Sequence, residues 1–131
     1  MKNDEFPTLG HSSFFVWGIL NIMVGKKIIL GISGSIAAYK AAFLTRLLVQ
    51  SGAEVQILMT ESATQFITPL TLSTLSKRPV HTKVSSEESW NNHVELAEWA
   101  DIFIIAPATS NTISSMANAR CDNLLLACFL S

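Results

Sequence analysis

The chain has 131 residues, which is enough for one domain with a sizeable core. Hydrophobic residues make up 49% and charged residues 15%, and the formal net charge of −1 provides no basic field to attract nucleic acid. The mean hydropathy of +0.36 is high for so small a domain, and it favours burial of surface against a partner, in the simplest case a second copy of the chain.

Residues 1–22 do not share the pattern of the rest, and we interpret them as an N-terminal extension. The apolar stretch 14–24 is shorter than the roughly 20 residues that span a bilayer, so no membrane segment is predicted. A signal peptide is the alternative, but Asp4 and Glu5 precede the apolar stretch and no small-residue cleavage site follows it. We expect one domain over 23–131.

The stretch 27–40 combines an apolar run, a turn of small residues and the start of a helix. The run 28–32 predicts a strand buried on both faces, and a helical pattern covers 36–50. Free backbone N–H groups and the positive end of the helix dipole point into such a turn, where Ser33 and Ser35 add hydroxyl groups. We interpret it as a site for a monophosphate. The alternative is a plain turn that binds nothing, since the dinucleotide-binding glycine spacing is absent.

A second strand is predicted over 54–59, parallel to the first because a helix connects the two. Thr60, Glu61 and Ser62 follow at its carboxyl end, where open α/β sheets bind their ligands. The alternative is a simple cap on the short helix that comes next.

The middle of the chain contains weaker signals. After another short helix that ends near residue 76, we predict an edge strand over 80–84, an exposed loop over 85–89 and a helix over 90–100. His93 shares a face of that helix with apolar residues. A lone histidine on such a face is more often part of a core or interface than catalytic.

A third strand, fully apolar and expected to be buried, is predicted over 101–106, and a helix over 113–119. Between them stand four polar residues, more than one helix cap requires, although capping is the alternative. They are Thr109, Ser110, Asn111 and Thr112. Polar loops at the carboxyl ends of parallel strands predict a pocket between them. The predicted fold class is α/β, an open Rossmann-like parallel sheet with helices on both faces.

The two cysteines, Cys121 and Cys128, are seven residues apart in an apolar helical pattern over 121–131. We expect both on nearly one face as buried free thiols, which indicates a reducing compartment and therefore the cytoplasm. No metal-ligand spacing occurs in the sequence, so no metal site is predicted.

Six segments recur together and in this order in a known family. They are 31–40, 59–63, 66–70, 93–101, 106–112 and 121–125. Over about residues 24–131 the chain resembles the homo-oligomeric FMN-containing cysteine decarboxylases. The resemblance implies a Rossmann-like flavoprotein that self-associates as a trimer or dodecamer and holds FMN at a subunit interface.

The resemblance also implies a reaction and the residues that carry it. The implied reaction converts 4′-phosphopantothenoylcysteine to 4′-phosphopantetheine in coenzyme A biosynthesis, by oxidation of the cysteinyl side chain, loss of CO₂ and reduction of the enethiolate. His93 becomes the active-site histidine, which deprotonates the thiol or orients the carboxylate. The implied FMN-binding residues are Ser33, Gly34, Ser35, Ile36, Ala37, Thr60, Glu61, Ser62, Thr109, Ser110, Asn111 and Thr112.

In the family, an asparagine that holds the substrate carboxylate and a flap with a cysteine follow the last helix seen here. The sequence stops before both, so we interpret it as a fragment or a truncated product that binds FMN weakly and does not release the reduced product. Three alternatives are a decarboxylase of peptide C-terminal cysteines, a flavin prenyltransferase and a non-catalytic interaction subunit. The segment 93–101 favours a decarboxylase over a prenyltransferase.

Overall fold

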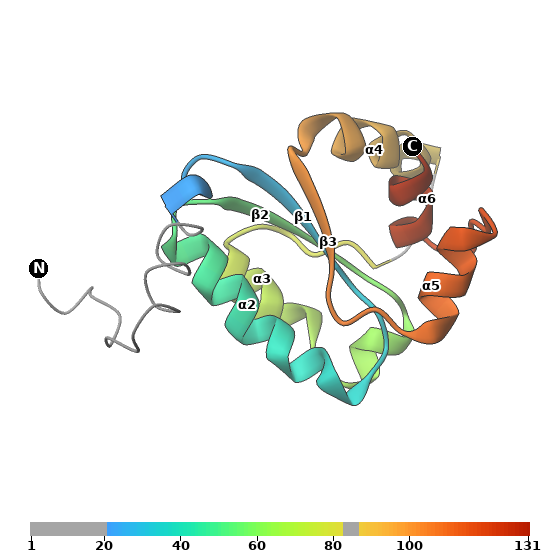
Figure 1. The fold of residues 1–131 in the computed structure, drawn as a ribbon, viewed down its shortest axis with the longest axis horizontal. Coiled ribbons are helices and arrows are strands. Elements are labelled where there is room, and N and C mark those ends of the chain that lie inside the picture. The colour runs from blue at the N-terminus through green and yellow to red at the C-terminus, as the bar shows by residue number, and fades with distance from the viewer. Residues whose placement is uncertain (1–20, 83–86) are drawn as a thin grey trace, which may run out of the picture.

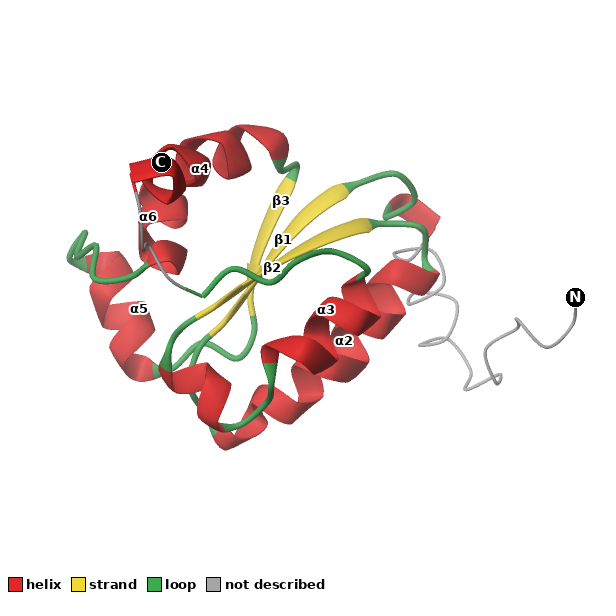
Figure 2. Ribbon diagram, turned by 180° about the vertical axis from the view of Figure 1, so that it is seen from behind, coloured by secondary structure: helices red, strands yellow, loops and turns green. Residues whose placement is uncertain are grey.

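The computed structural model describes residues 21–82 and 87–131, with side chains described from 93 onward in the second range (Figure 1). Its elements are β1 (Lys27–Ile32), η2 (Ile36–Ala38), α2 (Tyr39–Gln50), β2 (Glu54–Met59), η3 (Ser62–Gln65), α3 (Pro69–Ser76), α4 (Glu87–Trp99), β3 (Ile102–Ile105), α5 (Ser110–Ala117) and α6 (Leu124–Leu130). Figure 2 shows the sheet between α2 and α3 on one side and α4 and α6 on the other.

The sheet has three strands in the order β2-β1-β3, and both pairs are parallel. β1 pairs Lys27 with Glu54 of β2, and Ile28 with Ile102 of β3. Parallel strands need helical crossovers, and these place helices on both faces of the sheet. The predicted α/β fold class is therefore confirmed, as is the parallel pairing of the first two strands.

Each face of the sheet has its own hydrophobic cluster, because successive side chains of β1 point to opposite faces. Leu30 belongs to the cluster under α2 and α3, whereas Ile29 belongs to the cluster under α4 and α6. Gly31 allows α6 to come close to the central strand, since a Cβ atom on it would lie 2.8 Å from Cδ1 of Leu125. α6 thus packs directly on the middle of the sheet.

Two predicted helix starts are wrong. α4 begins at Glu87, so residues 87–89 are helical and not an exposed loop. Glutamates are good helix formers and interact favourably with the first turn, which explains the earlier start. α5 begins at Ser110 because the Thr109 side chain caps it, accepting a hydrogen bond from the Thr112 N–H group at 3.2 Å.

The edges of the sheet also differ from the prediction. Of the edge strand expected over 80–84, the described part contains one isolated bridge, in which His81 pairs with Leu58, and residues 83–84 lie outside the described residues. β3 is half-buried and not fully buried along its length. Its position as an edge strand explains this exposure, which an apolar sequence alone does not reveal.

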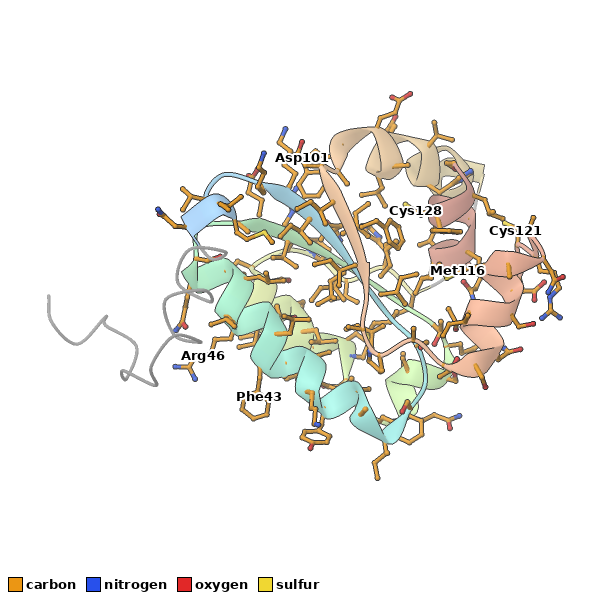
Figure 3. The ribbon with its side chains drawn as sticks, viewed as in Figure 1. Phe43, Arg46, Asp101, Met116, Cys121 and Cys128 are labelled. Atoms are coloured by element: carbon orange, nitrogen blue, oxygen red, sulfur yellow. The ribbon has the colours of Figure 1, made fainter. Side chains whose placement is uncertain are left out.

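The prediction of two buried thiols on one helix face is wrong for Cys121. That residue precedes α6 and is exposed, whereas Cys128 is buried (Figure 3). α6 starts only at Leu124, because the Asn123 side chain accepts a hydrogen bond from the Leu126 N–H group at 2.9 Å and caps the helix there. Burial raises the pKa of the Cys128 thiol to about 11.

We therefore expect iodoacetamide at pH 8 to alkylate Cys121 and leave Cys128 unmodified, because only a thiolate reacts and a buried thiol stays protonated. The urea-unfolded chain, as a control, should be alkylated at both positions. Peptide mass spectrometry measures the labelling, and equal rates at the two cysteines would contradict the prediction.

The free energy of unfolding should also fall as the pH rises from 9 toward 11, since the Cys128 thiol then ionises in the unfolded chain but not in the folded one.

Candidate functional site

Three loops follow the carboxyl ends of the three strands. We call residues 33–35 the first loop, 60–62 the second loop and 106–109 the third loop; they follow β1, β2 and β3 respectively. Because the strands are parallel, all three loops lie at the same edge of the sheet. The sequence predicted polar loops at this edge, and the structure brings the first loop into direct contact with each of the other two.

Ser33 joins the first loop to the third. Its backbone N–H group donates to the Pro107 carbonyl at 3.2 Å, and its hydroxyl group donates to the same oxygen. The hydroxyl oxygen also accepts a hydrogen bond from the Thr109 N–H group at 2.9 Å. The Ser33 side chain is 1% exposed, so these bonds lie in the interior of the site.

Gly34 joins the first loop to the second by close contact. A Cβ atom at Gly34 would lie 2.3 Å from Oγ, 2.6 Å from Cβ and 2.9 Å from the carbonyl carbon of Ser62. The space that any other side chain needs is therefore filled by Ser62. The N–H group of Thr60 also donates to the carbonyl of Ile32 at 3.0 Å, which holds the second loop beside the end of β1.

The helix starts next to these loops are capped by their own hydroxyl groups. Ser35 accepts from the Ala37 N–H group at 3.2 Å, and Thr60 accepts from the Ala63 N–H group at 3.2 Å. Capping is thus confirmed as one role of these residues and of Thr109. A further N–H group of each turn donates to a backbone carbonyl, Ala38 to Ser35 at 2.9 Å and Thr64 to Glu61 at 3.2 Å.

The predicted binding residues differ in their access to solvent. Three side chains are buried, namely Ser33, Thr60 and Thr112, the last with its hydroxyl accepting from that of Thr109 at 3.0 Å. The accessible predicted residues are Gly34, Ser35, Ile36, Ala37, Glu61, Ser62, Thr109, Ser110 and Asn111. The three loops contain no lysine or arginine and one carboxylate, that of Glu61, and their other polar groups are neutral hydroxyl and amide groups, which fit a phosphate held by N–H and O–H donors.

His93 lies on α4 and is 8% exposed. Leu96 and Ala97, one turn further along the same face, pack in the cluster that contains α6. α6 in turn packs against α5, whose first turn carries part of the predicted site. The position of His93 on an apolar face is therefore as expected.

A separate hollow of about 300 Å³ lies away from the three loops, between α4 and the segment after α3. It is lined by Arg78, His81, Glu95, Leu96 and Trp99. The guanidinium of Arg78 stacks 4.7 Å from the Trp99 ring centroid and lies 3.8 Å from a carboxylate oxygen of Glu54. Burial lowers the pKa of His81. Residues 21–82 and 87–131 contain no cluster of acidic, histidine and cysteine side chains able to hold a metal.

The sequence analysis missed Pro107, whose carbonyl oxygen accepts both hydrogen bonds from Ser33. A carbonyl group is present in every residue, so no sequence signal distinguishes this one. Only the neighbouring positions of β1 and β3 in the sheet bring it to Ser33.

The sheet and its three joined loops define a Rossmann-like α/β protein with a phosphate-compatible edge. The model of the flavoprotein family matches residues 21–131. The chain belongs to the flavoprotein family. No helix in the part of the chain that the structure describes is long and apolar enough to cross a membrane.

The chain is similar in sequence to two curated relatives. The chain is 48% identical over 114 residues to the coenzyme A biosynthesis bifunctional protein CoaBC of Vibrio vulnificus, matching 86% of this chain and 28% of that protein. It is 48% identical over 108 residues to a probable phosphopantothenoylcysteine decarboxylase of Streptococcus mutans, matching 81% of this chain and 60% of that protein. The chain therefore spans about a quarter of the first relative and less than two thirds of the second.

Solved structures share the fold. MrsD from a Bacillus species superposes with a TM-score of 0.73 at 32% identity, over 84% of this chain and 64% of MrsD. The peptidyl-cysteine decarboxylase EpiD gives a TM-score of 0.69 at 27% identity, over 82% of this chain and 65% of EpiD. TvaF, described as an FMN-dependent cysteine decarboxylase, gives 0.72 at 26% identity, over 80% of this chain and 66% of TvaF.

Proposed function

We propose that this chain binds FMN at the three loops and takes part in the decarboxylation of 4′-phosphopantothenoylcysteine to 4′-phosphopantetheine, in coenzyme A biosynthesis. The observation that carries the proposal is the junction of the loops through Ser33 and Gly34, which creates one continuous polar edge. The names of the Vibrio and Streptococcus relatives support the choice of substrate.

The residues of the loops suit FMN, a flavin nucleotide with one phosphate group. At the start of η2, the Ser35 hydroxyl and the Ile36 N–H group offer neutral donors to the phosphate, and the remaining accessible hydroxyl and amide groups serve the rest of the nucleotide. FMN, when bound, supplies reversible two-electron chemistry to the cysteinyl group. The chain itself binds and orients the two molecules.

His93 is proposed as the residue that acts on the substrate. An imidazole takes the proton from the substrate thiol, or it orients the carboxylate that leaves as CO₂. Its burial on α4 supports either role, because a side chain held by its surroundings keeps one orientation.

We propose that the chain self-associates, as a trimer or a dodecamer. Large apolar side chains are exposed on the helices that follow the first two strands: Ile36 is 79%, Phe43 69% and Leu70 75% exposed. Phe43 points away from the sheet on the outer side of α2 (Figure 3). Burial of such side chains against a second copy would remove them from water.

Decarboxylation of a peptide's C-terminal cysteine is the second candidate, supported by the structural similarity to EpiD. The higher sequence identity to the Vibrio relative, 48% over 114 residues, favours the small phosphorylated substrate.

Titration of the purified chain with FMN is expected to quench flavin fluorescence and to give a protein that retains a yellow colour after gel filtration. Riboflavin, which has no phosphate, should bind at least about tenfold more weakly, because the charged phosphate contributes about 1.4 kcal/mol or more through its hydrogen bonds. NAD should not compete. Retention of NAD in place of flavin would refute the proposal.

A further inference from the structure

The Ser33 hydroxyl has a role that its sequence pattern did not suggest. A serine hydroxyl contains one hydrogen, so it donates one hydrogen bond, and it accepts others through its lone pairs. Here the hydrogen goes to the Pro107 carbonyl, and a lone pair receives the Thr109 N–H group at 2.9 Å. The single donor that a phosphate would need is already used.

The backbone N–H group of Ser33 also has its hydrogen-bond partner in the third loop. It donates to the Pro107 carbonyl at 3.2 Å. With 1% of the residue exposed, neither donor of Ser33 faces solvent. Ser35, two residues further along, is by contrast half-exposed and begins the helical turn.

The partners of Ser33 belong to the third loop, and Thr109 among them caps α5. The Thr109 hydroxyl accepts from the Thr112 N–H group at 3.2 Å and donates to the Thr112 hydroxyl at 3.0 Å. A chain of hydrogen bonds therefore runs from the end of β1 through Ser33 to the first turn of α5. Hydrogen-bonded groups in a partly buried chain of this kind stabilise one another's positions.

We propose that Ser33 is a positioning residue, which holds the first and third loops in one fixed arrangement and does not itself touch the phosphate. This inference rests on the proposed binding of FMN. It replaces the direct contact that the sequence pattern predicted for Ser33. The phosphate is bound by the part of the first loop that begins at Ser35.

The test compares two serine variants and two ligands. Ser33→Ala should raise the Kd for FMN and for riboflavin by the same factor, about tenfold, because it disturbs the loops and not a phosphate contact. Ser35→Ala should raise the Kd for FMN by a similar factor and leave the Kd for riboflavin unchanged. Ser33→Thr, which keeps a hydroxyl, should restore most of the affinity, and Ser73→Ala on α3 serves as the control.

Amide hydrogen exchange tests the same coupling without any ligand. In the unmodified chain, the N–H groups of Ser33 and Thr109 should be protected to a similar extent, because both hydrogen bonds break when the two loops separate. In Ser33→Ala the Thr109 N–H group should lose at least about tenfold of its protection, since its acceptor is gone. This arm remains informative if Ser33→Ala proves too unstable for titration, because the unmodified chain alone shows whether the two amides open together.

The outcomes separate the two proposals. If Ser33→Ala weakens FMN but not riboflavin, the hydroxyl contacts the phosphate and the inference is wrong. It is also wrong if Ser33→Ala changes neither affinity, or if the two amides of the unmodified chain exchange independently. If the unmodified chain binds neither flavin, the proposed function fails, whereas the exchange data still decide whether Ser33 couples the loops.

Discussion

His93→Asn is expected to lower the release of CO₂ from 4′-phosphopantothenoylcysteine by about 10²- to 10⁴-fold, the usual loss when a group that transfers a proton is removed. Asparagine has a similar shape and forms hydrogen bonds, but its amide does not accept a proton at neutral pH. The affinity for FMN and the oligomeric state should remain unchanged. Release of labelled CO₂ from a substrate labelled in its carboxyl group measures the effect, with scintillation counting under anaerobic conditions.

A matched control for this variant is His81→Asn. His81 is half-buried beside β2 and lies outside the three loops, so its replacement should leave CO₂ release unaltered. Circular dichroism and light scattering should show that both variants fold and assemble like the unmodified chain. Full CO₂ release by His93→Asn would remove His93 from the proposed mechanism, whereas no CO₂ release by the unmodified chain would favour the alternative of a non-catalytic interaction subunit.

Gly34→Ala is expected to abolish detectable flavin binding at micromolar concentrations. The added methyl group would meet three atoms of Ser62 at 2.3, 2.6 and 2.9 Å, and the last of these is a backbone carbon that cannot rotate away. Overpacking of this kind costs about 1–3 kcal/mol. If this cost applies to the arrangement of the loops that binds FMN, the affinity for FMN falls about tenfold to hundredfold. Fluorescence titration with FMN measures the loss, and thermal unfolding measures the cost to stability.

The double variant Gly34→Ala with Ser62→Gly provides the internal check. It removes two of the three close atoms and should recover part of the affinity. Gly31→Ala is the control, because its methyl group would meet the flexible end of Leu125 on α6, 2.8 Å away, and no loop residue. That variant should lose stability and keep its flavin affinity. If Gly34→Ala bound FMN normally, the contact between the first and second loops would not matter for binding.

Much of the fold was predictable because its signals are local. The apolar run 28–32 indicates a strand buried on both faces, and the structure leaves its isoleucine and leucine side chains 0% exposed. The parallel pairing of β1 and β2 follows from the helix between them. The boundaries of α4 and α5 were less accurate, because polar residues such as Glu88 and Ser110 are compatible with both loop and helix.

The positions of the site were predictable for the same reason, but the roles of its residues were not. Small hydroxyl residues after buried strands predicted a phosphate site, and the structure places these residues at one edge of the sheet. The same residue type, serine, has two environments there. Ser33 is buried and forms hydrogen bonds to Pro107 and Thr109, which are 74 and 76 positions further along the chain. Ser35, by contrast, begins a helix, and its side chain is accessible.

The sequence by itself determined the fold class, the three polar loops and the position of His93 on an apolar helix face. Each of these features depends on residues that lie within about one or two helical turns of one another. The tertiary structure alone decided which hydroxyl groups point inward, that Ser62 fills the space beside Gly34 and that Cys128 is buried while Cys121 is exposed. These features arise from strands and loops that are distant in the chain, and the order β2-β1-β3 brings them together.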